Sequence, residues 1–170
     1  MNARKLLILA LALLMLGTIA LAESAQDVGS QCTDFELTTL TGETFRLSDC
    51  RGKVVFINIW ATWCPPCVSE MPEIDRLAAA YPDELVVLGV SVDDRMSTVK
   101  EFIAEKGYSY AIAMDDASYT VANKLFPTYA IPNSIFIDPN GIVTSIEAGA
   151  ADYATLERRF LDAKLHAELN

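Results

Sequence analysis

Seven consecutive residues, Val54 to Trp60, form an almost unbroken apolar run, Val-Val-Phe-Ile-Asn-Ile-Trp. The run is rich in β-branched side chains and predicts a strand. A strand that lacks apolar–polar alternation is buried on both faces, as in sheets that are covered on both sides. This segment therefore predicts the central strand of an α/β domain.

Strand-like and helix-like segments alternate along the rest of the chain. Residues 35–47 read as a hairpin with Gly42 in its turn, and a helix is expected to begin near Pro66 or Cys67. Further strands are expected at residues 85–92, 110–114, 134–137 and 142–147, and further helices at 96–106, 118–125 and 152–169. Residues 34–170 are thus predicted to form one α/β sandwich around a mixed sheet.

The N-terminal segment has the pattern of a secretory signal peptide. Arg4 and Lys5 precede an uncharged run from Leu6 to Ala22, which ends in Ala-Leu-Ala. The same run is close to the roughly 17–25 residues that span a bilayer, so an uncleaved membrane anchor stays open. Either alternative for residues 1–22 predicts a protein outside the cytosol, in the periplasm or on the outer face of the membrane. Residues 23–33 are small and polar, and predict a flexible linker.

Charge and composition exclude several functions. The formal net charge is -10, which disfavours nucleic-acid binding because that needs a basic face to neutralise phosphates. The single histidine, His166, leaves little for histidine-based catalysis or a histidine-rich metal site. We therefore expect no metal and no cofactor.

The clearest site motif is Cys64-Pro65-Pro66-Cys67, located where the central strand ends and a helix begins. The N-terminus of a helix stabilises a thiolate through its unpaired N–H groups and its dipole. Cys64, before the helix, is predicted to be the attacking thiol, and Cys67 to resolve the mixed disulfide. An inert disulfide and half of a zinc site are the alternatives, although structural zinc usually needs a second close Cys or His pair.

The residues around this motif resemble the TlpA/ResA-like thiol–disulfide oxidoreductases of the thioredoxin superfamily. The resemblance rests on 52–67, on Glu-Met-Pro at 70–72, on Asp-Phe-Glu-Leu at 34–37, on Leu-Ser-Asp at 47–49, on Ile-Pro at 131–132, on Phe-Ile-Asp at 136–138 and on Gly141. It implies a thioredoxin-like sandwich, with a mixed central sheet flanked by helices and an N-terminal β-hairpin.

The same resemblance implies an extracytoplasmic enzyme, more often a reductant than an oxidant, and apocytochrome c as one class of substrate. The partners that it implies are disulfide-bearing exported proteins and a membrane thiol relay as electron donor. Pro132 matches the cis-proline that faces the dithiol. Substrates are accordingly expected to contact Trp63, Pro65, Pro66, Ile131 and Pro132.

Glu70 matches an acidic residue that is thought to assist proton transfer in ResA-like members. The alternative is a solvated acid in the first turn of the helix, where the dipole favours it. Asn58 stands where cytosolic thioredoxins carry a buried Asp on the strand before the site, and it cannot accept a proton. Asn133 and Ser134 follow Pro132, where the family commonly has Thr, which leaves the identity of the partner open.

Cys32 and Cys50 flank the predicted hairpin, and a structural disulfide between them is the preferred interpretation. A second redox pair that relays electrons to the dithiol, free thiols, and pairing with another protein remain alternatives.

Two other functions compete with thiol–disulfide exchange. A peroxiredoxin shares the fold but needs a Pro-x-x-x-Thr-x-x-Cys pattern, and counting back from Cys67 gives Cys64 and Trp60 at the Thr and Pro places. A non-catalytic thiol-binding chaperone that uses the same groove is the other.

Overall fold

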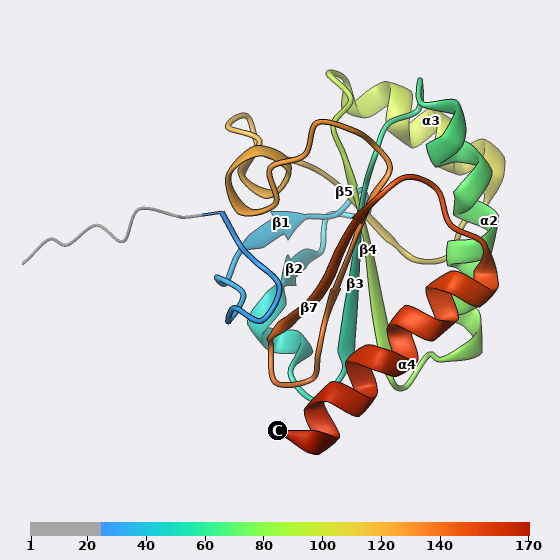
Figure 1. Cartoon of the computed structure of the whole chain (residues 1–170). Helices are drawn as coiled ribbons and strands as arrows, with labels where there is room; N and C mark the ends of the chain where they lie inside the picture. The colour runs from blue at the N-terminus through green and yellow to red at the C-terminus, as the bar shows by residue number, and fades with distance from the viewer. Residues whose placement is uncertain (1–24) are drawn as a thin grey trace, which may run out of the picture.

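The computed structural model describes residues 25–170, and a five-stranded sheet forms its centre (Figure 1). The strand order is β5-β4-β3-β6-β7, with β3 in the middle. Strand β3 pairs in parallel with β4 and antiparallel with β6, so the sheet is mixed, as predicted. All seven residues of β3 are buried. The strands are β3 (Val54–Trp60), β4 (Leu85–Ser91), β5 (Ala111–Met114), β6 (Asn133–Ile137) and β7 (Val143–Ala148).

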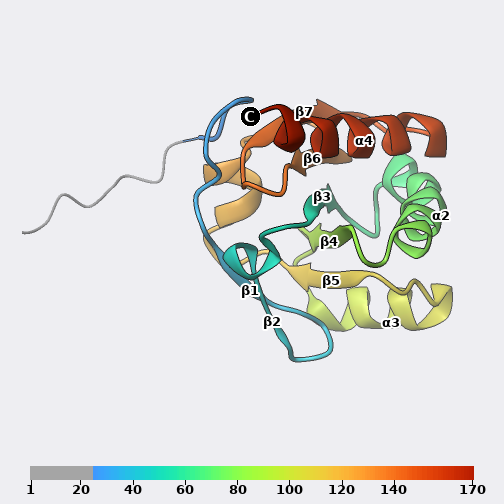
Figure 2. The same cartoon turned by 90° about the horizontal axis from the view of Figure 1, so that it is seen from below.

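Three helices pack on one face of this sheet and a hairpin with two short helices packs on the other (Figure 2). The first face carries α2 (Pro65–Ala80), α3 (Met96–Lys106) and α4 (Tyr153–Leu169). The second carries β1 (Glu36–Thr38), β2 (Thr44–Arg46), η1 (Leu47–Cys50) and η2 (Thr120–Leu125). The buried apolar side chains accordingly form two clusters, one on each side of the sheet.

The short helix expected at residues 118–125 differs from the prediction. It is a π-helix, η2, and Tyr119 before it has a left-handed backbone with φ 49°. The carboxylate of Asp115 accepts hydrogen bonds from the backbone N–H groups of Val121 and Ala122, at 3.1 and 2.8 Å. A side chain at the end of β5 therefore satisfies N–H groups in the first turn of this helix.

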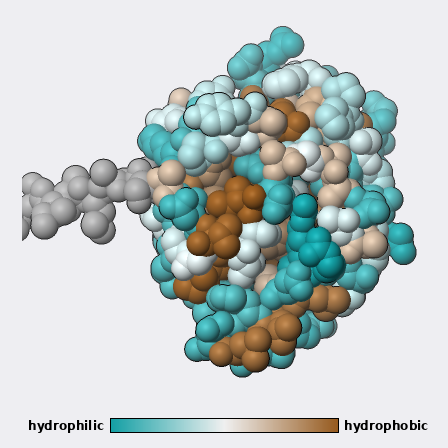
Figure 3. Space-filling model, viewed as in Figure 1, coloured by the Kyte–Doolittle hydropathy of each residue, from teal (hydrophilic) through white to brown (hydrophobic). Residues whose placement is uncertain are grey.

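The last helix, α4, begins at a side-chain cap. The carboxylate of Asp152 accepts a hydrogen bond from the N–H of Thr155 at 2.9 Å, which satisfies a free donor of the first turn. One face of α4 packs on the sheet, and a strip of leucines stays exposed along another (Figure 3). The exposed leucines are Leu161, Leu165 and Leu169.

Residues 25–33, predicted as linker, lie against the domain. The N–H of Gln26 donates to the carbonyl oxygen of Leu125 at 2.7 Å, and the N–H of Cys32 donates to that of Gly141 at 2.9 Å. The predicted signal peptide or anchor, residues 1–22, lies outside the described residues. Within residues 25–170, no helix combines the length and apolar character that a membrane crossing requires.

Candidate active site

Cys64 and Cys67 lie at the start of α2 and form a disulfide, with their Cα atoms 5.3 Å apart. Cys64 is the N-cap of the helix, and its Sγ accepts a hydrogen bond from the N–H of Cys67 at 3.2 Å. Pro65 and Pro66 occupy the next two positions, where a missing N–H costs nothing. A thiolate on Cys64 would be stabilised by this N–H group and by the helix dipole.

The two sulfur-bearing residues differ in accessibility. Cys64 keeps 5% of its surface exposed, whereas Cys67 is fully buried. Of the two sulfur atoms, that of Cys64 is therefore the one that an incoming thiol or disulfide can reach.

The loop before β6 faces the dithiol from the other side. The peptide bond between Ile131 and Pro132 is cis, which confirms the prediction for Pro132. The carbonyl oxygen of Ile131 lies 3.7 Å from the Sγ of Cys64. The structure thus brings together the cysteine motif and the Ile-Pro motif, which are more than sixty residues apart in the sequence.

Glu70, one turn after Cys67, is buried with 2% of its surface exposed. Its Oε2 accepts from the Nδ2 of Asn58 at 3.3 Å, and its Oε1 accepts from the N–H of Ala151 at 3.1 Å. Burial raises the pKa of the carboxyl from 4.5 to about 7, and these two hydrogen bonds oppose the shift only in part. Glu70 is therefore not a solvated acid of the first helical turn.

The segment that leads from β3 to Cys64 is held by Asp93, a residue that the sequence analysis did not single out. The N–H and the hydroxyl of Thr62 donate to its carboxylate at 2.9 and 2.6 Å. Ser91 at the end of β4 donates to the same carboxylate at 2.8 Å. An acid just after the neighbouring parallel strand was the available signal, since the carboxyl ends of parallel strands meet at one edge.

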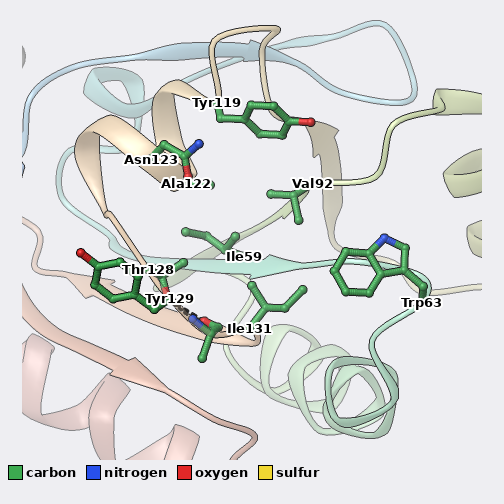
Figure 4. Close-up of a pocket in the computed structure, with 10 residues that line it drawn as sticks. Ile59, Trp63, Val92, Tyr119, Ala122, Asn123, Thr128, Tyr129 and Ile131 are labelled. Carbon is green, nitrogen blue, oxygen red and sulfur yellow. Dashed lines mark hydrogen bonds between the residues drawn. The ribbon is translucent and has the colours of Figure 1, made fainter.

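A pocket of about 310 Å³ opens beside the dithiol (Figure 4). Trp63 lies on one side of it and Asn123 and Thr128 lie on the other, with Ile59 and Ile131 between them and Tyr119 at the top of the view. Trp63 exposes 67% of its surface, so it offers a large aromatic face next to Cys64. Pro65 and Pro66 are exposed as well, whereas Pro132 is buried. Exposed aromatic and apolar groups around a reactive sulfur suit the binding of a polypeptide.

The disulfide predicted between Cys32 and Cys50 is not formed in this structure, where both residues are free thiols. Cys32 is buried in the apolar cluster under the hairpin, and Cys50 is half-buried against the same cluster. Burial raises the pKa of Cys32 to about 12 and also raises the pKa of Cys50. The hairpin is closed without a covalent link, by the β1–β2 ladder and by the N–H of Leu47, which donates to Phe35 O at 3.1 Å. Both thiols thus have the properties of structural rather than reactive cysteines.

His166 lies at the end of the sheet away from the dithiol. Its Nδ1 is 2.7 Å from the Oδ2 of Asp138, at the end of β6 that is remote from Pro132. In the part of the chain that the structure describes, no group of three or more His, Cys, Asp or Glu side chains could hold a metal ion. Glu70 and the two cysteines of the dithiol lie on or at the start of the same helix, α2, at the opposite end of the sheet from His166.

Comparisons with known proteins point in one direction. The model of the AhpC/TSA family matches residues 28–146. The thiol-disulfide oxidoreductase ResA of Geobacillus kaustophilus is 36% identical over 143 residues, which cover 84% of this chain and 81% of that protein.

Solved structures agree with the sequence matches. A thioredoxin-family thiol:disulfide interchange protein of Chlorobium tepidum superposes with a TM-score of 0.71 at 25% identity, over 82% of this chain and 99% of that one. The exposed lipoprotein thioredoxin Etrx1 of Streptococcus pneumoniae superposes with a TM-score of 0.65 at 26% identity, over 76% of this chain and 99% of that one.

Proposed function

The chain belongs to the AhpC/TSA family of thioredoxin-like proteins and is a ResA-like thiol–disulfide oxidoreductase, and we propose that it reduces disulfides of exported proteins outside the cytosol. The observation that carries this proposal is the position of Cys64. Its sulfur caps α2, accepts the N–H of Cys67 and lies 3.7 Å from the carbonyl oxygen of Ile131. A substrate sulfur can approach along that face.

The reaction begins with both cysteines reduced. The Cys64 thiolate attacks one sulfur of a substrate disulfide, forms a mixed disulfide and releases the other substrate sulfur as a thiolate, which takes a proton from solvent. Cys67 then loses its proton and attacks the Sγ of Cys64. This step forms the Cys64–Cys67 disulfide and releases the second substrate thiolate, so the substrate gains two electrons and the enzyme loses two.

Glu70 is the proton acceptor in the second step. It lies three residues after Cys67 on the same helix, and residues at this spacing are neighbours on a helix surface. Its pKa of about 7 lets the carboxyl both accept and release a proton near neutral pH. Asn58 cannot take this role, and its amide instead holds the carboxylate by a hydrogen bond.

The substrate docks beside the dithiol as an extended segment. The exposed face of Trp63 and the pocket between Ile59 and Ile131 receive its side chains. Pro65 and Pro66 are exposed next to Cys64, and Pro132 follows Ile131, whose carbonyl oxygen faces the Cys64 sulfur. Because none of the residues that line this pocket is charged, the surface suits a range of exported proteins, among which we propose apocytochrome c.

Location and electron supply follow from the same proposal. The leader-like residues 1–22 and the likeness to an exposed lipoprotein thioredoxin support a position outside the cytosol, with the membrane involved only through an uncleaved anchor. A dithiol that reduces substrates stoichiometrically must itself be reduced after each turnover. We propose a membrane thiol relay as that donor.

A trapping variant tests the proposal. In Cys67→Ala, the mixed disulfide on Cys64 cannot be resolved, so substrates stay covalently attached until a reductant is added. The matched control is Cys64→Ala, which keeps Cys32, Cys50 and Cys67 and therefore reports adducts that form elsewhere. We expect apocytochrome c among the Cys64-dependent adducts. An absence of such adducts, with insulin reduction unchanged in Cys64→Ser, would contradict exchange through this residue.

The direction of the reaction is measured separately. We expect the reduction potential of the Cys64–Cys67 pair to lie near that of thioredoxin, about -270 mV, rather than near that of DsbA, about -120 mV. A potential close to the second value would make the protein an oxidant and refute reduction of exported proteins.

A further inference from the structure

A line of polar side chains runs from Glu70 across the face of the sheet that α2 and α4 cover. Asn58 of β3 pairs with Ser134 of β6, and Ser134 pairs with Glu147 of β7. Directly paired residues project to the same face of a sheet. Phe136, two residues after Ser134, packs in the apolar cluster with α2 and α4, so this face is the one that the helices cover.

Ser145 extends the line towards the edge of the sheet. It pairs with Phe136 and therefore projects to the same face. It also lines a pocket of about 320 Å³ between β7 and α4, together with Glu147, Arg158 and Arg159. The pocket is thus the place where the polar line that starts at Glu70 meets the surface.

Four buried polar atoms along this line have no hydrogen-bond partner within residues 25–170. They are the Oδ1 of Asn58, the Oγ atoms of Ser134 and Ser145, and the Nη1 of Arg159. Buried polar groups are normally satisfied, and where protein partners are lacking, ordered water supplies the bonds. Orphaned atoms beside Glu70 and at the pocket therefore favour a hydrated passage over a dry interface.

Arg159 also couples this pocket to Glu70 electrostatically. Its guanidinium favours the charged carboxylate and lowers the pKa of Glu70 against the larger effect of burial. Ser134 acts in the same direction, close to the carboxylate but without a hydrogen bond of ordinary geometry. The other groups that face Glu70 are Asn58, the N–H of Ala151 and Tyr110, the residue before β5. Tyr110 is buried and stays neutral because burial raises its pKa.

We propose that Arg159 is a positioning residue for proton exchange at Glu70, and that the pocket between β7 and α4 is the route by which this proton reaches solvent. The inference rests on the proposed function, in which Glu70 takes the proton of Cys67. A substrate docked on Trp63 and Ile131 covers the face of the dithiol. The proton that Glu70 accepts then leaves on the other side of the protein, through Ser145 and Arg159, and the carboxylate is restored for the next turnover.

The positioning role is tested in the oxidised protein, where the dithiol does not titrate. The side-chain carboxyl of Glu70 is followed by 13C NMR as a function of pH in the wild type, Arg159→Met and Arg159→Lys. We expect the midpoint to rise by on the order of half a unit to one unit in Arg159→Met and to return towards the wild type in Arg159→Lys. Arg158→Met is the matched control, since Arg158 lines the same pocket but is exposed and paired with Asp162. Equal midpoints in Arg159→Met and the wild type would overturn the role.

The route is tested at Ser145 with two isosteric variants. Ser145→Val and Ser145→Thr add similar volume, but only the second keeps a hydroxyl group. The resolving step is measured in stopped flow with reduced protein and a peptide disulfide, with tryptophan fluorescence as the signal. We expect Ser145→Val to slow the step several-fold near neutral pH and Ser145→Thr to stay close to the wild type. Equal rates in the two variants would refute the route.

The role of Glu70 as proton acceptor and the route through Arg159 and Ser145 are refuted by different results. Glu70→Gln with an unchanged resolving step would remove Glu70 from the mechanism and refute that part of the proposed function. A slow Glu70→Gln, with unchanged behaviour of the Arg159 and Ser145 variants, would keep the function of Glu70 and overturn only the route.

Discussion

Replacing Glu70 by glutamine should change how the stability of the oxidised protein depends on pH. The carboxyl of Glu70 is buried, and its pKa is raised from 4.5 to about 7 in the folded state. Between these two values the folded protein holds a proton on Glu70 that the unfolded chain releases. The contribution of Glu70 to the free energy of unfolding therefore decreases as the pH rises through this window, and it becomes level above it.

The magnitude follows from the two pKa values. At roughly 1.4 kcal/mol per pH unit, the gap between 4.5 and about 7 corresponds to a loss of about 3 kcal/mol. Glutamine cannot ionise, so Glu70→Gln lacks this contribution while it keeps every other titrating group. The difference in unfolding free energy between the variant and the wild type should thus move by about 3 kcal/mol in favour of the variant between about pH 4.5 and about pH 8.

Urea unfolding, followed by tryptophan fluorescence with the disulfide intact, measures this difference. Glutamine also turns an amide N–H₂ towards the donors of Asn58 or Ala151, which shifts the stability of the variant by an amount that does not depend on pH. Only the pH-dependent part of the stability difference therefore tests the raised pKa. Glu73→Gln, on the exposed side of the same helix, is the control and should follow the wild type. Parallel curves for Glu70→Gln and the wild type across the whole range would refute the raised pKa.

Two further predictions concern groups around the site. Asp93→Ala should lower the free energy of unfolding by about 1–3 kcal/mol and slow disulfide exchange, because the N–H and hydroxyl of Thr62 lose their acceptor. The control is Asp94→Ala, at the exposed neighbouring residue, which should have neither effect. Equal effects of the two variants in urea unfolding would contradict the anchoring role of Asp93. Alkylation of the native oxidised protein, followed by peptide mass mapping, should label Cys50 well before Cys32, since Cys32 is buried and its pKa is about 12. Recovery of a Cys32–Cys50 disulfide peptide would contradict the free thiols.

The elements that the sequence predicted best are those in which local pattern and tertiary burial agree. The apolar run of β3, the amphipathic α3 and the capped α4 end within about a residue of their predicted bounds. The short helix before Pro127 was predicted as an ordinary helix and is a π-helix instead. Its first N–H groups bond to Asp115, a residue outside the helix, and periodicity within the segment contains no trace of that contact.

The same distinction applies to the site. The position of Cys64 and Cys67 between a strand and a helix could be predicted, because both elements follow from the pattern of neighbouring residues. The pKa of Glu70 could not, since it is raised by burial against the sheet and lowered by hydrogen bonds from Asn58 and from the N–H of Ala151, which is 81 residues away in the chain. Whether Cys32 and Cys50 form a disulfide could not be predicted either, for a related reason. Their spacing shows that a hairpin could bring two thiols together, but it does not give the direction in which their side chains point.

The acid of this site, Glu70, lies on helix α2 and not on strand β3. This position determines both the loss of stability that its carboxyl causes and the proton-transfer role proposed for it. A carboxyl three residues after Cys67 shares a face of α2 with the resolving sulfur, and that face is packed against the sheet. Burial there disfavours the charged form, and two hydrogen bonds and the distant Arg159 offset the effect only in part. The net effect is a pKa of about 7 for Glu70. A group that accepts and releases a proton near neutral pH needs a pKa in this range. The stability lost as the pH rises from about 4.5 to about 7 and the proposed proton transfer therefore have one physical origin, the burial of this carboxyl.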